Sequence, residues 1–406
     1  MASTLSYNAP FPVAAMAWAN TSGPQQYLQS PNVLQRPTPV AHSPESSFRL
    51  AIGSFVEDYS NQIQVIGLNS GLPLTDPDVP PIGYDGSDFN VLASTHHGYP
   101  ATKIAWEPST SSPHSPLKRS KSELIASSSD VLKIWEYNQE SNLEANSGFI
   151  HTKNGTNTPG SLNLISQLTP KTPGTAAPLT SFSWNETIPS RIVTCSIDFQ
   201  TTCTVWDLDT RTAITQLIAH DREVYDVQWL PRSSDIFVSV GADGSLRAFD
   251  LRSLEHSTIL YETTPPTTSS DKKRSNSPLL RLEFNPHDSN YLATFKHGSG
   301  EINILDMRSP GAPVTNIKGH NGNISSISWK SDGSLLATGS DDRTVQVWDI
   351  NKSKRSNNSS SKANVVTESI ANHKSAYQVH SIEWSKRKSS NWIAMASNYQ
   401  IKLLKL

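Results

Sequence analysis

The stretch LIAHDREVYDVQWLPRSSDIFVSVGADGSLRAFDLR (Leu217–Arg252) decides the fold of this chain. It opens with a histidine-containing turn and continues as an alternating strand that ends in Trp229. A second strand, a tight turn at Asp243-Gly244 and a third strand follow. A close copy, IKGHNGNISSISWKSDGSLLATGSDDRTVQVWDI, occupies Ile317–Ile350. A pattern that recurs within one chain indicates a repeated structural unit.

The first strand of this unit can be found throughout the chain, because it alternates apolar and polar residues and ends in an aromatic anchor. Alternation with a period of two is typical of a strand with two different faces. The later anchors follow one another at intervals of 45 or 55 residues. The anchors are Trp18, Trp106, Trp184, Trp229, Phe284, Trp329 and Trp384.

A second and a third strand are predicted after every anchor, whereas a fourth, outer strand is clear only before His220, at 257–262 and before Gly319. The second strands are expected at 48–55, 122–129, 190–196, 235–241, 290–296, 334–340 and 391–397. The third strands are expected at 61–68, 131–137, 201–208, 245–251, 301–307, 344–350 and 400–406.

This unit resembles the WD40 repeat, and seven such units resemble a seven-bladed β-propeller. One blade cannot bury both of its faces alone, but blades arranged around an axis pack each face on a neighbour. We therefore expect an all-β fold in which residues 1–406 form a single seven-bladed WD40 β-propeller. The seventh unit lacks an outer strand, and residues near Ser3–Asn8 are expected to supply it and close the ring.

The remaining length is expected in insertions that are rich in Ser, Thr, Asn and Pro. Such segments bury too little apolar surface to offset the entropy lost on ordering, so we expect them to be disordered. The strand order places all of them except 263–278 on one face of the ring. The insertions are predicted at about 20–46, 107–121, 138–177, 263–278 and 351–375.

A histidine, a hydroxyl and an aspartate recur in two units. A hydrolase triad uses the same residue types, but a triad occurs once, whereas this spacing is repeated, which indicates a structural hydrogen-bond network. In the fourth unit Phe249 stands where the sixth has a tryptophan, so that network has no indole donor. The expected members are His220, Ser239 and Asp243 in the fourth unit and His320, Thr338, Asp342 and Trp348 in the sixth.

The third unit departs from this spacing, because Phe199 and Gln200 lengthen its turn. We expect a looser hairpin there, with less certain pairing around Cys203. The only other cysteine is Cys195, which suits a reducing compartment, and two thiols cannot form a zinc site by themselves. His96-His97 lacks a cysteine or carboxylate cluster at ligand spacing. No metal and no cofactor is therefore expected.

Charge and hydropathy limit the classes of partner that we expect. Lys and Arg number 34 and Asp and Glu 36, and the resulting net charge of -2 favours neither nucleic acid nor an acidic membrane. The N-terminal residues lack the charged region of a signal peptide, and no window approaches the ~18 apolar residues that span a bilayer. We expect a soluble protein of the cytoplasm and nucleus, present as a monomeric propeller within complexes.

Two third strands end in Asp-x-Arg, at Asp250-Leu251-Arg252 and Asp306-Met307-Arg308. Each arginine can be an ordinary surface residue paired with the nearby aspartate. The segments also resemble the W-D-x-R box with which some WD40 proteins dock on the linker protein of cullin-4 ubiquitin ligases, although Phe or Leu replaces the Trp here. That resemblance makes Arg252 and Arg308 candidate partner-binding residues.

Several segments together resemble the Transparent Testa Glabra family of WD40 adaptors, which includes a plant adaptor and an animal cullin-4-associated factor that binds kinases. The resemblance implies a non-catalytic scaffold that assembles protein kinases and transcription factors. Two alternatives stay open: a substrate receptor of a cullin-4 ubiquitin ligase, and a propeller enzyme. The segments are 50–68, 177–186, the region from Ser196 to Trp206, 216–229, 239–262 and 278–294.

Overall fold

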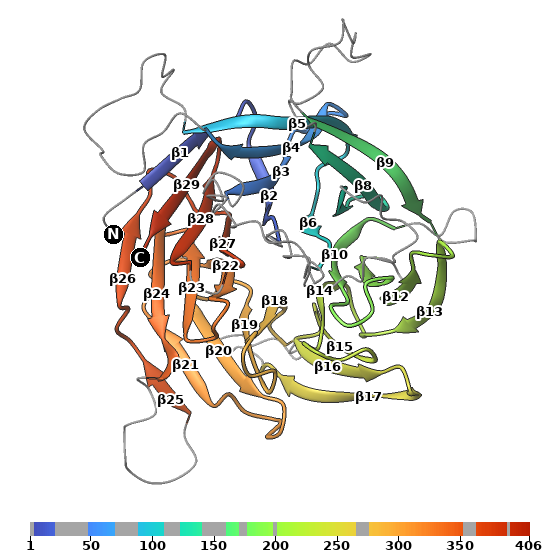
Figure 1. The fold of residues 1–406 in the computed structure, drawn as a ribbon. Coiled ribbons are helices and arrows are strands. Elements are labelled where there is room, and N and C mark those ends of the chain that lie inside the picture. Colours follow the sequence, from blue (N-terminus) through green and yellow to red (C-terminus); the bar gives the residue numbers. More distant parts are fainter. Residues whose placement is uncertain are drawn as a thin grey trace, which may run out of the picture.

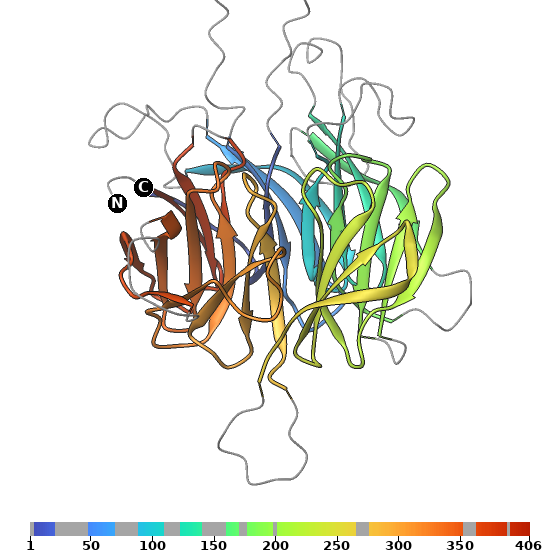
Figure 2. The ribbon, with the colours of Figure 1, turned by 90° about the horizontal axis from the view of Figure 1, so that it is seen from below.

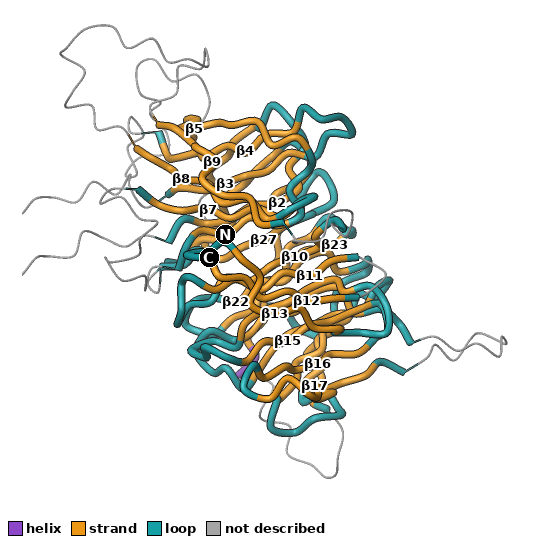
Figure 3. The backbone as a smooth tube through the Cα atoms, turned by 90° about the vertical axis from the view of Figure 1, so that its right-hand side faces the viewer, coloured by secondary structure: helices purple, strands orange, loops and turns teal. Residues whose placement is uncertain are grey.

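The computed structural model is an all-β propeller of seven sheets around a central axis, as predicted (Figure 1). Strands make up nearly all of its regular structure (Figure 3). The first strand of each blade contacts the first strands of both neighbours, so the ring is continuous. The structure describes residues 4–20, 48–69, 88–108, 122–139, 160–169, 177–197, 201–264, 276–351, 363–387 and 390–406.

Blades 1 to 3 each contain four strands in consecutive order from the axis outward. Blade 1 consists of β2 (Val13–Trp18), β3 (Arg49–Ser54), β4 (Asn61–Leu68) and β5 (Phe89–Gly98). Blade 2 consists of β6 (Lys103–Trp106), β7 (Glu123–Ser128), β8 (Leu132–Gln139) and β9 (Gly160–Leu168). Blade 3 consists of β10 (Leu179–Trp184), β11 (Arg191–Ser196), β12 (Thr202–Asp207) and β13 (Thr212–Ile218).

Blades 4 to 7 complete the ring. Blade 4 consists of β14 (Val224–Trp229), β15 (Ile236–Gly241), β16 (Ser245–Asp250) and β17 (Ser253–Glu262). Blade 5 consists of β18 (Leu279–Phe284), β19 (Tyr291–Lys296), β20 (Glu301–Asp306), β21 (Thr315–Lys318) and the added β25 (Asn364–Val366). Blade 6 consists of β22 (Ile324–Trp329), β23 (Leu335–Ser340), β24 (Thr344–Asp349) and β26 (Ala371–Lys374). Blade 7 consists of β27 (Ser381–Trp384), β28 (Trp392–Ser397), β29 (Gln400–Lys405) and β1 (Thr4–Asn8).

The hydrophobic core lies between neighbouring blades. Second strands such as β15 and β23 are almost entirely buried, because each is paired on both edges and covered by a blade on each face. Trp229 of blade 4, for example, packs in one cluster with Val193 and Cys195 of blade 3. The period-two alternation seen in the sequence therefore reflects two sides of one blade that pack on two different neighbours.

The N-terminal strand closes the ring, as predicted. β1 pairs antiparallel with β29 from Thr4 opposite Leu404 to Asn8 opposite Gln400, and the two strands lie side by side in Figure 1. Tyr7 is buried within the cluster that joins blades 7 and 1, and its hydroxyl donates a hydrogen bond to Oε1 of Gln64 at 3.2 Å. The last blade is thus completed by the opposite end of the chain.

Two of the predicted insertions contain strands, so their boundaries were wrong. β9 lies within 138–177 and supplies the outer strand of blade 2, and β25 and β26 lie within 351–375. These strands were not recognised in the sequence, because an outer strand lies at the rim of its blade and is less enclosed than an inner one. In β9 exposed and buried positions consequently follow one another without regular alternation. Most residues of the other predicted insertions lie outside the described residues, and so does the prediction that they are disordered.

The third unit is more regular than expected. β11 and β12 pair without interruption from Arg191 opposite Asp207 to Cys195 opposite Cys203, so the prediction of uncertain pairing around Cys203 was wrong. Both cysteines are buried, and they are not joined by a disulfide bond. The prediction of a looser hairpin concerns residues 198–200, which lie outside the described residues. Thr201, which follows them, adopts a left-handed conformation with φ of 53°.

The ring has two faces, seen edge-on in Figure 2. We call insertion face the side with the connections from first to second and from third to fourth strands. We call turn face the side with the turns from second to third strands and the connections that lead to the next blade. Six gaps interrupt connections of the insertion face, at 21–47, 70–87, 109–121, 140–159, 352–362 and 388–389. Three interrupt connections of the turn face, at 170–176, 198–200 and 265–275.

Candidate functional site

The histidine network of blade 6 joins four side chains in a row by hydrogen bonds. The indole Nε1–H of Trp348 donates to Oγ1 of Thr338 at 2.9 Å, this hydroxyl lies 2.7 Å from Nε2 of His320, and His320 Nδ1 lies 2.9 Å from Asp342. Burial lowers the pKa of His320, although Asp342 acts in the opposite direction. Since Thr338 is fully buried and its hydroxyl oxygen already accepts a hydrogen bond from the indole N–H, this oxygen is in no position to attack a substrate.

Blade 4 builds its network differently at both ends. His220 joins Ser239 at 2.8 Å and Asp243 at 3.0 Å, but the chain stops at Ser239, because Phe249 stacks on Phe237 where an indole would be. At the other end Asp243 is enclosed by more donors. Burial alone would raise the pKa of Asp243, but hydrogen bonds from His220 and Ser245 outweigh burial and hold that pKa well below its ordinary value.

A third network, which the sequence did not reveal, joins His97 of β5 in blade 1 to β7 and β8 of blade 2. Trp135 donates to Oγ of Ser127 at 2.8 Å, and Ser127 lies 2.9 Å from Nε2 of His97. His97 Nδ1 lies 2.6 Å from the carbonyl oxygen of Tyr99, and burial lowers the pKa of His97 to about 4. His97 was considered only as a metal ligand, yet it precedes Trp106 by the same interval at which His220 and His320 precede their next anchors.

Arg252 and Arg308 lie at equivalent turns of blades 4 and 5, both on the insertion face. Each guanidinium makes a bidentate contact to its own aspartate: Arg252 Nε and Nη2 donate to Asp250 at 2.9 and 2.6 Å, and Arg308 donates to Asp306 at 2.9 and 2.7 Å. Arg308 also lies over the ring of Tyr291. The arginine side chains remain 68% and 58% exposed, so these contacts fix their direction without covering them.

The turn itself does not need the arginine. In blade 6 the backbone N–H of Asn351 donates to Asp349 at 3.0 Å, and in blade 3 Asp209 does the same to Asp207 at 2.9 Å. The aspartate therefore caps this turn with any residue two positions later. The two arginines are additions to a turn that is already stable.

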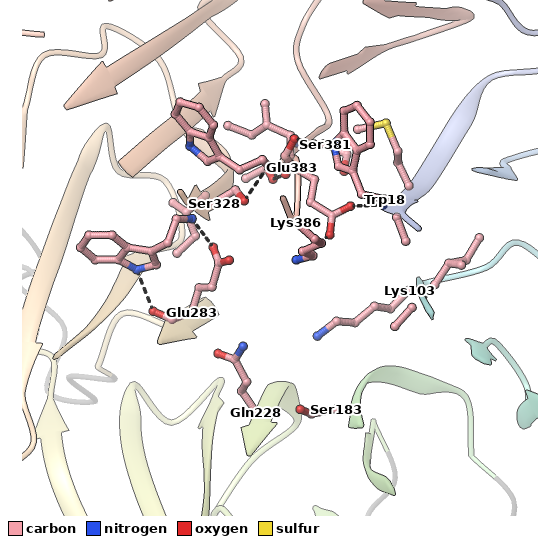
Figure 4. Close-up of a pocket in the computed structure, with 18 of the residues that line it drawn as sticks. Trp18, Lys103, Ser183, Gln228, Glu283, Ser328, Ser381, Glu383 and Lys386 are labelled. Carbon is pink, nitrogen blue, oxygen red and sulfur yellow. Dashed lines mark hydrogen bonds and ion pairs between the residues drawn. The ribbon is translucent and has the colours of Figure 1, made fainter. Parts of the chain in front are cut away.

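A cavity of about 900 Å³ runs along the axis and is lined mainly by the first strands (Figure 4). Its polar side chains stand immediately before the anchor aromatics, and they bind the next blade. Ser183, Gln228, Glu283, Ser328 and Glu383 each accept a hydrogen bond from the backbone N–H of the following blade's anchor, between 2.7 and 3.2 Å. Glu383 makes the contact that joins blade 7 to Trp18 of blade 1.

Two of the cavity's carboxylates, Glu283 and Glu383, therefore each accept a hydrogen bond from a backbone N–H. Glu383 also pairs with Lys386 at 2.8 Å (Figure 4). Removal from bulk water raises the pKa of Glu283 to about 8, although the charge of Lys386 and the Trp329 N–H act in the opposite direction. A raised carboxyl pKa also occurs in general acids, but the bond to Trp329 gives this side chain a structural task that recurs around the ring.

Asp226 joins more blades than any residue selected from the sequence. Its carboxylate accepts hydrogen bonds from Ser181 of blade 3 at 2.5 Å and from the Leu282 N–H of blade 5 at 3.0 Å, and Lys103 of blade 2 lies 3.5 Å away. Burial would raise the pKa of Asp226, but the charges of Lys103 and Arg281 and these bonds lower it overall. Its position three residues before Trp229, among the axis-facing residues, was the available signal.

Among the described residues, no three His, Cys, Asp or Glu side chains gather as a metal site would require. Within the same residues, no helix is long and apolar enough to cross a membrane.

Seven blades with repeated histidine–hydroxyl networks define a WD40-repeat β-propeller. The family model described as WD domain, G-beta repeat matches residues 211–250 and 311–349, which include the two copies that decide the fold.

The chain is 35% identical over 401 residues to a DDB1- and CUL4-associated factor 7 homolog of Dictyostelium discoideum, which covers 98% of both chains. It therefore belongs to the WD40-repeat family that includes this relative. It is also 37% identical to an uncharacterized WD repeat-containing protein of Schizosaccharomyces pombe and 36% identical to a WD repeat-containing protein of Saccharomyces cerevisiae. Those matches cover 76% and 75% of this chain, and 65% and 55% of the yeast proteins.

Proposed function

We propose that this protein is a non-catalytic scaffold that holds two or more other proteins on one rigid ring, with protein kinases and transcription regulators among them. The observation that carries the proposal is that the histidine networks and the axial carboxylates hold the fold together. The histidine networks fix the blades internally, and the axial carboxylates join one blade to the next. A propeller whose polar interior serves the fold still offers two faces and a circumference to partners.

The similarity to the Transparent Testa Glabra adaptors supports kinases and transcription regulators as partners, and cytoplasm and nucleus as location. The two buried cysteines, which form no disulfide with each other, suit a reducing compartment. The test is a two-step affinity purification, which asks whether a single copy of the chain holds two different proteins at once. Recovery of pairs only, never of a three-component complex, would contradict the scaffold.

A second candidate function is that of a substrate receptor of a cullin-4 ubiquitin ligase. The full-length relative is named for association with DDB1 and CUL4, and Arg252 and Arg308 point from neighbouring blades on one face. Because Asp250 and Asp306 hold the guanidinium groups in place, less side-chain entropy is lost when a partner binds them. Their Nη1 donors have no hydrogen bond within the described residues and so can meet a carboxylate or carbonyl of the partner.

Replacing both arginines, Arg252→Ala with Arg308→Ala, is expected to reduce recovery of purified DDB1 at least about tenfold, since exposed arginines with fixed geometry are frequent hot spots. The measurement is a quantitative pull-down with equal amounts of folded protein. Arg211→Ala is the matched control, because Arg211 is exposed on the same face in the neighbouring blade 3. Equal recovery by the double variant and the control would remove the basis of the receptor proposal.

A further inference from the structure

Five exposed aromatic side chains gather on one part of the turn face. They come from two turns, β3–β4 and β28–β29, and from the two inter-blade connections β26–β27 and β5–β6. Their exposed fractions range from 44% for Tyr99 to 70% for Tyr59. We call them the aromatic arc: Tyr377, Tyr399, Phe55, Tyr59 and Tyr99. The turn-face loops of blades 4, 5 and 6 have no exposed large hydrophobic residue among those described and carry charged and amide side chains instead.

Hydrogen bonds between successive loops show that the arc is continuous. Ser375, in the loop of Tyr377, bonds to Ser397 at 3.2 Å, just before Tyr399. The carbonyl of Tyr399 accepts the Ala9 N–H at 2.7 Å, and the Phe55 N–H donates to the carbonyl of Pro12 at 2.8 Å. The loop 9–12 that closes the ring thus lies between Tyr399 and Phe55, and its Pro10 is exposed.

The blade 1 end of the arc is rigid and acidic. The rings of Tyr59 and Tyr99 meet edge to face with centroids 5.3 Å apart, and His96 bonds to the carbonyl of Tyr59 at 2.6 Å. The same turn carries Glu57 and Asp58, both exposed, and within the described part of the chain neither forms an ion pair. Asp58 Oδ1 accepts hydrogen bonds from the backbone N–H and the hydroxyl of Ser60, which are neutral groups. Two carboxylates without an ion-pair partner beside two tyrosine rings favour a cation, through charge attraction and through cation–π contact.

From this juxtaposition we propose that the aromatic arc binds an extended segment of a partner protein that presents Lys or Arg to Tyr59 and Tyr99 and apolar side chains to Phe55 and Tyr399. The proposal deepens the scaffold function, on which it rests, by naming a surface and the chemistry of its ligand. Rigid aromatics supply large contact area at little entropic cost, and exposed groups of this kind mark interaction sites. The acidic residues exclude nucleic acid as the favoured occupant.

The test uses the full chain and a displayed library of short random peptides. Selected peptides are expected to combine Lys or Arg with apolar residues. Their Kd, measured by fluorescence anisotropy, should rise at least about tenfold in the variant Tyr59→Ala, Tyr99→Ala, Tyr399→Ala. The variant Glu57→Gln, Asp58→Asn should weaken binding by a smaller factor and reduce its dependence on salt.

The matched control replaces equally exposed apolar residues of the circumference, Ile214→Ala, Leu254→Ala and Ile259→Ala. It should bind the selected peptides as the unmodified chain does, and all variants should melt at the same temperature. Selection of acidic peptides, or equal binding by arc variant and unmodified chain, would overturn the proposal. A concentration-dependent dimer that the arc variant abolishes would also overturn it, since the occupant would be a second copy. If the arc fails while cellular complexes persist, the scaffold function stands without this surface.

Discussion

Deletion of residues 1–8 is expected to lower the melting temperature by roughly 8 °C or more. β1 supplies the outer strand of blade 7, so its loss removes the whole ladder with β29 and leaves an uncovered strand edge. Burial of Tyr7 is lost as well, and large-to-small changes at such sites cost about 3–5 kcal/mol. For a domain of this size each kcal/mol corresponds to about 2 °C. The measurement is a thermal melt followed by circular dichroism or calorimetry.

The control deletes only residues 1–3, which precede β1. Tyr7→Ala in the full chain separates the buried side chain from the strand ladder, and it should produce roughly half or more of the loss. An unchanged midpoint after removal of 1–8 would show that β1 does not close the ring.

Asp226→Ala is expected to destabilise the protein by about 3–5 kcal/mol, the usual cost of breaking a buried charged group away from its partners. The change leaves the N–H of Leu282 and the hydroxyl of Ser181 without their acceptor. It also removes the negative charge that interacts with Lys103 and Arg281. Blades 2, 3, 4 and 5 lose one shared contact. Chemical denaturation, read as the shift of the midpoint, measures the effect.

Asp235→Ala serves as the control, because Asp235 is partly exposed and forms a longer contact of 3.4 Å with Arg191. Its removal should cost no more than about 1 kcal/mol. Asp226→Asn should fall between the two alanine variants, since the amide oxygen can still accept one bond. Equal denaturation midpoints for Asp226→Ala and Asp235→Ala would mean that the contacts of Asp226 between blades do not stabilise the protein.

The first three strands of each blade were predictable because their two sides pack on two different neighbours, which imposes alternation on residues such as those of β14 and β22. The closing strand was predictable for another reason, since blade 7 otherwise lacked an outer strand. β9, β25 and β26 were concealed, because an outer strand is stabilised by a ladder with a distant partner and needs little apolar sequence of its own.

Candidate sites were harder to predict, because they depend on which blades become neighbours. His97 was visible as a histidine, but its hydroxyl partner lies in β7 and its indole donor in β8. Asp226 contacts three other blades, and its position three residues before Trp229 indicates that it faces the axis but not which blades it contacts. The aromatic arc joins Phe55 to Tyr399, which are distant in sequence and come together only when β1 closes the ring.

The scaffold proposal is tested most directly by two-step affinity purification from cells, first through the tagged chain and then through one recovered partner. A parallel chain is shortened at 21–47, 109–121, 140–159 and 352–362, four segments of the insertion face. We expect the second eluate to contain the chain, the chosen partner and at least one further protein, with and without these segments. A second eluate that never contains a third protein would contradict the scaffold. Loss of every partner on shortening would assign binding to the removed segments instead of the ring.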